Sequence, residues 1–221
     1  MSDKKILIVT TNTSKINDEI PTGVWFEEFA VPYITFEATG YKITVASPLG
    51  GVSPVDETSY SCSNPVEWDS TKKFLDNTKK LDEVENEEFD AVFIPGGHGP
   101  MFDLPHNIKL AQILSKHYAK NKIISAVCHG PCGLISAKTP NGEPIVKDKY
   151  VTAFTNKEEQ IMKRVEFMPF LLQDKLVESG AKFVEERPWV EPAEVDGNLI
   201  TGQNQNSALK VAEEVIKKLG D

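Results

Sequence analysis

The sequence has little cysteine, no long hydrophobic run and no excess of basic residues. Its 221 residues include only three cysteines, an odd number that argues against a disulfide framework and favours a reducing compartment. The apolar run within MSDKKILIVTTN is too short for a signal peptide or a membrane span. We therefore expect a cytoplasmic protein whose first buried strand lies in this run.

The charge balance is acidic, with 33 Asp and Glu against 24 Lys and Arg and a net charge of −9. This excess argues against nucleic acid or an anionic membrane as a partner. Apolar residues make up 40% of the chain, enough for a sizeable core. Since no repeat or low-complexity segment interrupts the chain, we expect a single domain over residues 1–221.

Short apolar stretches alternate with helical patterns. Strands are predicted at 5–10, 41–47, 89–94 and 122–127, with shorter candidates at 150–154, 183–184 and 199–201; helices are predicted at 22–39, 107–119, 130–137 and 207–219. This alternation predicts an α/β fold of the flavodoxin-like, doubly wound kind, with a mainly parallel sheet and helices on both faces.

One segment, at about residues 57–88, is longer than a simple connection between two such units needs. It contains Cys62, Trp68 and many Lys, Asp and Asn residues. A long insertion near strand ends is often a lid, although it can also be a surface excursion, and both alternatives stay open.

The stretch IISAVCHGPCGL runs a buried strand into Cys128 and His129, between the small residues Ala126 and Gly130. A strand that turns sharply into a helix at such a residue is typical of a nucleophile elbow. The helix start beyond it predicts a lowered thiol pKa. The alternative is that Cys128 is simply a small buried side chain, which we also expect of Cys132.

His129 follows the cysteine directly, so it is not expected to fold back onto the sulfur easily, but it could act as an acid or base on a bound substrate. A second turn, IPGGHGP, contains Gly96, Gly97 and His98 and ends the preceding strand. The two turns should meet at the carboxyl edge of the sheet. The amides of Gly97 and His129 are then natural oxyanion donors, and the residues beside them, including Gly130, would line the substrate site.

Three stretches carry a resemblance to a known family: AVCHGPCGL, FIPGGHGPMFDL and TGVWFEEFAVPYITFEATGYKITVASPLGG. Together they resemble the ThiJ/PfpI superfamily, which has the class I glutamine-amidotransferase-like fold. The nearer match is its heat-shock-protein-31-like branch. The resemblance runs from Lys5 to the last helix.

The resemblance implies two carboxylates for the site. The family's glutamate beside the cysteine matches Glu28, with Glu27 as the alternative that the sequence leaves open. The acidic residue that orients the histidine matches Glu159, with Glu158 still possible. Because Glu28 lies among aromatic residues, its pKa is expected to be raised, so that it could share a proton with the thiol.

The resemblance also implies an activity. The branch is associated with glutathione-independent glyoxalase activity of the glyoxalase III type (a lyase of the D-lactate dehydratase class), which detoxifies methylglyoxal and glyoxal without a cofactor. Protein deglycase activity, a stress response and homodimers are further associations. The expected partner is therefore a small reactive aldehyde.

Two alternatives remain open at this point. A cysteine peptidase or amidase would use the same thiol, while a non-enzymatic holdase chaperone or thiol redox sensor would not need turnover. A glutaminase of the related amidotransferases would need a histidine well downstream of its cysteine. This chain has four histidines and none lies downstream of His129, so glutaminase activity is not expected. No Cys and His spacing predicts a metal site, and none is expected.

Overall fold

The computed structural model of the chain describes residues 4–60 and 64–220. Its main sheet has seven strands in the order β3-β2-β1-β4-β5-β9-β8; all neighbours run parallel except β8, which is antiparallel to β9. In that order the strands span Lys79–Lys80, Lys42–Ser47, Lys5–Val9, Ala91–Ile94, Ile123–Val127, Leu199–Gly202 and Ala193–Asp196. A second, two-stranded sheet pairs β6 (Tyr150–Val151) with β7 (Lys182–Phe183). The predicted α/β sheet is confirmed.

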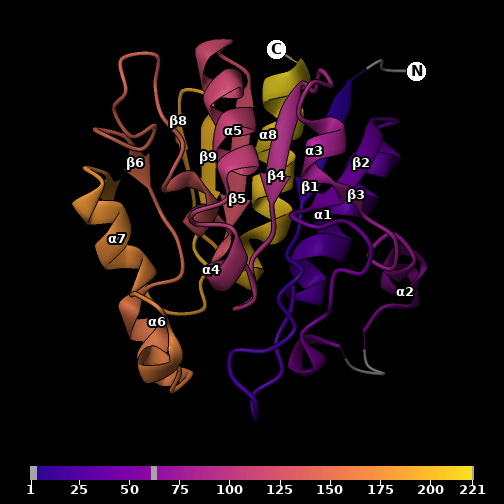
Figure 1. The fold of residues 1–221 in the computed structure, drawn as a ribbon, viewed down its shortest axis with the longest axis vertical. Coiled ribbons are helices and arrows are strands. Elements are labelled where there is room, and N and C mark those ends of the chain that lie inside the picture. The colour runs from indigo at the N-terminus through magenta and orange to yellow at the C-terminus, as the bar shows by residue number, and fades with distance from the viewer. Residues whose placement is uncertain (1–3, 61–63, 221) are drawn as a thin grey trace.

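Helices cover both faces of this sheet, with α5 on one face and α1 and α8 on the other (Figure 1). The α-helices are α1 (Phe26–Ala38), α2 (Val66–Lys72), α3 (Leu81–Val84), α4 (Pro100–Asp103), α5 (Ile108–Ala119), α6 (Asn156–Ile161), α7 (Leu172–Glu178) and α8 (Ala208–Gly220). Short 3-10 helices are η1 (Glu57–Ser59), η2 (Gly130–Leu134), η3 (Val165–Phe167) and η4 (Gln205–Ser207). Among the described helices, none is both long and apolar enough to cross a bilayer.

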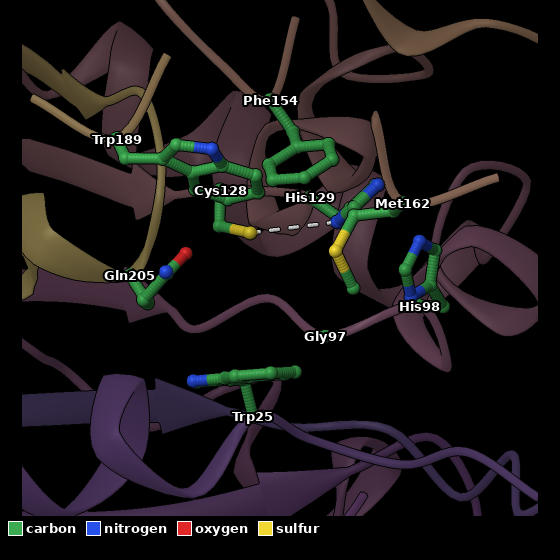
Figure 2. A pocket seen from close by; sticks show the side chains of 9 residues that line it. All are labelled: Trp25, Gly97, His98, Cys128, His129, Phe154, Met162, Trp189 and Gln205. Atoms are coloured by element: carbon green, nitrogen blue, oxygen red, sulfur yellow. Dashed lines mark hydrogen bonds between the residues drawn. The ribbon is translucent and has the colours of Figure 1, made fainter. Parts of the chain in front are cut away.

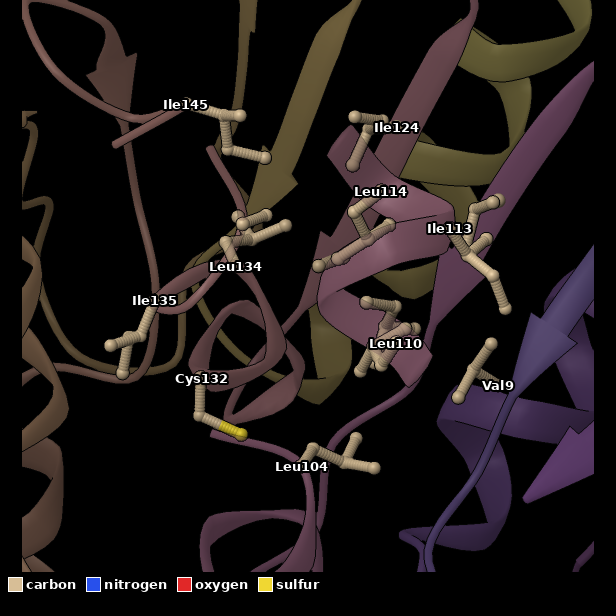
Figure 3. Packing of buried hydrophobic residues seen from close by; sticks show 14 of the residues in the cluster. Val9, Leu104, Leu110, Ile113, Leu114, Ile124, Cys132, Leu134, Ile135 and Ile145 are labelled. Carbon is tan, nitrogen blue, oxygen red and sulfur yellow. The ribbon is translucent and has the colours of Figure 1, made fainter. Parts of the chain in front are cut away.

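The alternation of side chains along β1 explains why both faces need covering. Leu7 packs into one hydrophobic cluster with Leu110 of α5, while Ile8 packs into the other with Phe29 of α1. Successive residues of a strand point to opposite faces, and all three of β1's central residues are fully buried. Figure 3 shows the first cluster, which also holds Cys132, so the prediction that this cysteine belongs to the core is confirmed.

Two expectations about local structure were wrong. The helix expected at 130–137 is only η2, because Pro131 and two glycines make a regular α-helix unfavourable there. The helix expected from residue 22 begins at Phe26, since Val24 is still extended and exchanges backbone hydrogen bonds with residues 54 and 56. The short strands expected at 150–154 and 183–184 are confirmed at 150–151 and 182–183, where they pair with each other in the small sheet.

The described part of the 57–88 segment lies on the outside of the sheet edge (Figure 1). It supplies the edge strand β3 and buries Leu75, Leu81 and Val84, while Trp68 packs edge-on against Phe26 of α1. Cys62 lies outside the described residues. The described part of the segment thus extends the sheet and core, and its possible motion as a lid stays a prediction.

Candidate active site

Cys128 lies at the carboxyl end of the central strand β5, where the chain turns into η2. Its φ of 61° is in the left-handed region that non-glycine residues rarely adopt. Both of its peptide groups are held: its N–H donates to the Gly202 carbonyl, and its carbonyl accepts from the Phe154 N–H, each at 2.9 Å. The chain around it therefore maintains a strained turn at the end of the strand, as the predicted elbow requires, while the role of Cys128 as a nucleophile stays a prediction.

The glycine after the elbow is required by close packing. A Cβ on Gly130 would lie 2.1 Å from the carbonyl oxygen of Ile94, at the end of the neighbouring strand. On the facing turn, where Gly97 has a φ of 90°, a Cβ on Gly96 would lie 2.6 Å from the His129 backbone nitrogen. The two turns therefore pack together as predicted, backbone against backbone.

Glu28 is the glutamate beside the thiol, whereas Glu27 is half-exposed. The Glu28 side chain is fully buried, and its Oε2 accepts a hydrogen bond from the Gly96 N–H at 2.6 Å. Its Oε1 has no hydrogen-bond partner among the described residues. Burial raises the pKa of Glu28 from 4.5 to about 8, so the carboxyl is protonated at neutral pH, as expected from the sequence.

The expected lowering of the thiol pKa was wrong. Burial and the adjacent Glu28 carboxyl raise the pKa of Cys128 well above its usual value, and the Gly97 N–H opposes this only partly. The short η2 begins beyond the thiol, but its partial positive charge does not outweigh the loss of solvent. The thiol therefore needs a nearby base to take its proton.

The imidazole of His129 is in contact with the thiol, and its role as an acid or base stays a prediction. Its Nδ1 lies 3.4 Å from the Cys128 sulfur. This contact differs from the expectation that adjacent side chains do not meet easily, and the sharp turn at Cys128 makes it possible. The Nε2 of His129 lies 2.7 Å from Oε2 of Glu159, and His98 Nε2 lies 2.8 Å from Oε1 of the same carboxylate. Thiol, imidazole and carboxylate form one continuous chain of contacts.

The protonation states follow from these contacts. Burial alone would raise the pKa of Glu159, but the imidazoles of His129 and His98 lower it, so the group is an ionised carboxylate that only accepts hydrogen bonds. Burial lowers the pKa of His129 despite this carboxylate. A neutral His129 that donates from Nε2 to Glu159 leaves the lone pair of Nδ1 facing the thiol.

Glu158, the alternative to Glu159, is also buried but points away from both histidines. Its carboxylate binds Thr155, at the start of α6, and backbone or side-chain amides near Trp189. The sequence could not separate these two glutamates because both lie in one turn of a charged helix. The structure gives them different surroundings.

A cavity of about 180 Å³ opens above the thiol (Figure 2). Figure 2 shows Trp25 on one side and Phe154 and Trp189 on the other, with the Cys128–His129 contact between them. The lining residues are Trp25, Gly97, His98, Cys128, His129, Phe154, Met162, Trp189 and Gln205. Of the predicted binding residues, Gly97 and His98 line the cavity, whereas Gly96 and Gly130 pack behind it.

The aromatic wall was missed by the sequence analysis. Trp25 lies two residues before the expected Glu27–Glu28 pair, and Phe154 lies two residues before α6, so nearness to those motifs was the available signal. Met162 and Trp189 had no such signal, since they reach the cavity only through the tertiary fold. Within the described parts of the chain, the 57–88 segment does not contribute to the lining.

The imidazoles of His98 and His129 and the Glu159 carboxylate also form a set that could hold a metal ion, since their ligand atoms lie within 4.8 Å of one another. Sequence spacing did not reveal this set. Both carboxylate oxygens are already hydrogen-bonded to imidazole nitrogens, an arrangement that a proton relay explains fully. That the protein works without a metal stays a prediction.

Residues 20–218 match the model of the DJ-1/PfpI family. The chain belongs to the DJ-1/PfpI family. Two relatives in curated collections are each 34% identical: the glutathione-independent glyoxalase hsp3101 of Schizosaccharomyces pombe, over 98% of this chain and 96% of that protein, and glyoxalase 3 of Candida albicans, over 96% and 97%.

Solved structures agree with membership of the DJ-1/PfpI family. The crystal structure of glyoxalase III from Candida albicans has a TM-score of 0.89 and 31% identity, covering 97% of this chain and 96% of that chain. Rapid Encystment Protein 24 kDa from Francisella tularensis has a TM-score of 0.93 and 35% identity, covering 98% and 99%. The expected superfamily and its glyoxalase-bearing branch are thereby confirmed.

Proposed function

We propose that this chain is a glutathione-independent glyoxalase, which converts methylglyoxal to lactate and glyoxal to glycolate. The observation that carries the proposal is the contact of the Cys128 thiol with neutral His129 at the base of a small, aromatic-walled cavity. The names of the full-length relatives support the same reaction. The enzyme would need no glutathione, because its own thiol forms the adduct.

The first step is addition of the Cys128 sulfur to the aldehyde carbon. Nδ1 of His129 takes the thiol proton, and the carbonyl electron pair moves onto the aldehyde oxygen. The amides of Gly97 and His129 would stabilise that oxygen as its charge develops. Glu159 stabilises the imidazolium that forms on His129. The imidazolium then gives its proton to the former aldehyde oxygen, and a hemithioacetal results.

The second step moves a proton between the two substrate carbons. Neutral His129 removes the hydrogen of the former aldehyde carbon as a proton, which leaves an enediolate. The imidazolium then returns this proton to the neighbouring carbon, while the hydroxyl proton on the former aldehyde carbon moves to the former ketone oxygen. Protonated Glu28, next to the sulfur, keeps a second negative charge away from the thiol during this exchange. The product is a thioester between Cys128 and the 2-hydroxy acid.

Hydrolysis completes the cycle. Water attacks the thioester carbonyl, the carbon–sulfur bond breaks and Cys128 recovers its proton, releasing the hydroxy acid. The sum of the three steps is the addition of one water to the 2-oxoaldehyde, and no oxidant or reductant is consumed. Every group that the steps require is contributed by this chain or by solvent.

The cavity also bears on the peptidase alternative. An extended peptide needs an open cleft on both sides of the nucleophile, whereas Trp25, Phe154 and Trp189 line a cavity of only about 180 Å³ beside Cys128. A small aldehyde suits a cavity of this size better than a peptide. A dimeric assembly and a cytoplasmic location remain part of the proposal, on the basis of resemblance and composition.

The test is lactate formation from methylglyoxal in the absence of glutathione. We expect wild type and Cys132→Ala, which changes a core thiol, to form lactate, whereas Cys128→Ser forms none and Glu28→Gln forms it more slowly. If wild type forms no 2-hydroxy acid while Cys128 is still alkylated by iodoacetamide, the thiol is reactive but the glyoxalase proposal is wrong.

A further inference from the structure

Glu158 is fully buried, yet it takes no part in the steps above. Its Oε2 accepts hydrogen bonds from the Thr155 backbone N–H at 3.0 Å and the Thr155 hydroxyl at 2.9 Å. Its Oε1 accepts from the Trp189 N–H at 3.1 Å and from the side-chain amides of Gln203 at 3.0 Å and Asn204 at 2.8 Å. Donors from three separate segments thus converge on one carboxylate.

Among the residues bound by Glu158, Trp189 has a backbone conformation that needs support from its surroundings. Its φ of 65° is unfavourable for a bulky residue. Its N–H is bound by Glu158, and its carbonyl accepts a hydrogen bond from the Asn206 side chain at 2.6 Å. The strained conformation therefore depends on two flanking hydrogen bonds, one of which is accepted by the buried Glu158 side chain.

The position of Trp189 shapes the space next to the thiol. Its ring centroid lies 5.8 Å from that of Phe154, and the Phe154 centroid lies 4.4 Å from that of His129. Figure 2 shows Trp189 and Phe154 side by side above Cys128. A shift of Trp189 would widen the cavity without moving the thiol–imidazole–carboxylate chain.

We propose that Glu158 is a positioning residue that fixes the Trp189 wall and thereby sets the preference of the enzyme among 2-oxoaldehydes. The inference rests on the glyoxalase function. The part of the substrate that the Trp189 wall recognises is the substituent on the ketone carbon. A methyl group contacts the wall, whereas the hydrogen of glyoxal does not. Glu159 thus acts in the reaction by stabilising the imidazolium, and Glu158 acts in substrate preference by positioning Trp189.

The experiment compares Glu158→Gln with Glu159→Gln on glyoxal, methylglyoxal and phenylglyoxal. A buried methyl contact contributes about fourfold to binding. We expect Glu158→Gln to raise KM for methylglyoxal about fourfold with little change in kcat, to leave KM for glyoxal nearly unchanged, and to shift kcat/KM toward phenylglyoxal. Glu159→Gln should instead lower kcat for all three substrates.

Trp189→Ala should reproduce the substrate pattern of Glu158→Gln. Equal changes for the three aldehydes in Glu158→Gln would overturn the proposal, since a general loss of folded enzyme acts on every substrate alike. If Glu158→Gln does not fold, the fallback variant is Asn206→Ala, which removes the hydrogen bond to the Trp189 carbonyl from an exposed position. An unchanged ratio of kcat/KM among the three aldehydes in that variant would equally overturn the inference.

A second readout separates this inference from the glyoxalase proposal. The rate of alkylation at Cys128, followed by peptide mass, is compared for iodoacetamide and for the bulkier N-phenyl iodoacetamide. Loosening the wall should favour the bulky reagent severalfold in Glu158→Gln, whether or not the protein forms lactate. An unchanged ratio would show that Glu158 does not control the cavity.

Discussion

Glu28→Gln replaces a fully buried carboxyl with a neutral side chain of nearly the same shape. Because burial raises the pKa of Glu28 from 4.5 to about 8, the folded chain keeps a proton that the unfolded chain releases between these pH values. The stabilisation is therefore complete below pH 4.5 and is lost as the pH rises through about 8. The free energy of unfolding of wild type should therefore fall as the pH rises over this range. Glu28→Gln lacks the titrating carboxyl, so its free energy of unfolding should not show this fall.

The magnitude follows from the two pKa values. Their separation corresponds to roughly 5 kcal/mol in the free energy of unfolding, at about 1.36 kcal/mol for each pH unit. Between pH 5 and pH 8, about 3 to 4 kcal/mol of this would be lost, since Glu28 is still half-protonated at the upper limit. That is a large share of the total stability of a typical domain, about 5–15 kcal/mol.

Urea denaturation followed by far-UV circular dichroism, at several pH values from 5 to 8, measures this difference. Glu27→Gln is the matched control, because it changes the neighbouring, half-exposed carboxyl and leaves the buried one in place. Burial also raises the pKa of Glu27, so the control should lose a smaller part of the pH dependence, whereas Glu28→Gln should show the much flatter pH profile. Parallel profiles for wild type and Glu28→Gln would mean that Glu28 is already ionised when folded, and the reasoning about the protonated carboxyl would fail.

Three further outcomes are expected. Glu159→Gln removes the charge that stabilises the imidazolium, so kcat for methylglyoxal should fall by at least about a hundredfold with KM little changed; steady-state kinetics measure this, and an equal kcat would exclude the relay. Gly130→Ala places a Cβ against the Ile94 carbonyl, which cannot move away freely, so unfolding experiments should show a loss of about 3 kcal/mol. Cys132→Ser buries a hydroxyl in an apolar cluster and should cost about 1–3 kcal/mol, while the activity of the remaining folded enzyme is retained.

The features predicted from the sequence were those encoded locally. The approach of Cys128 to the end of an apolar strand, with Gly130 two residues later, was sufficient to predict the elbow. The Gly96–Gly97 pair was similarly sufficient to predict a turn at the same sheet edge. Resemblance then added Glu28 and Glu159, which lie far from the cysteine in the chain and could not have been paired with it by spacing.

The features that were missed depend on long-range burial. The thiol pKa was expected to fall because a helix start is visible in the sequence, but the depth of Cys128 and its contact with Glu28 are not. Trp189 lies in a polar stretch of the sequence. It reaches the cavity because two elements bind it, namely α6 and the turn that follows β9. Solvent exclusion is a property of the assembled layers, so no short stretch of sequence reports it.

The neighbouring glutamates of α6 have a consequence for how this fold can vary. One helical step rotates a side chain by about 100°, and this single step separates the residue that faces the histidines from the one that faces the tryptophan. An insertion or deletion of one residue between Thr155 and Glu159 would put both carboxylates out of register at once. Reaction and substrate choice are thus inherited together along this short helix, and new selectivity would have to arise by substitution around it rather than by changes in its length.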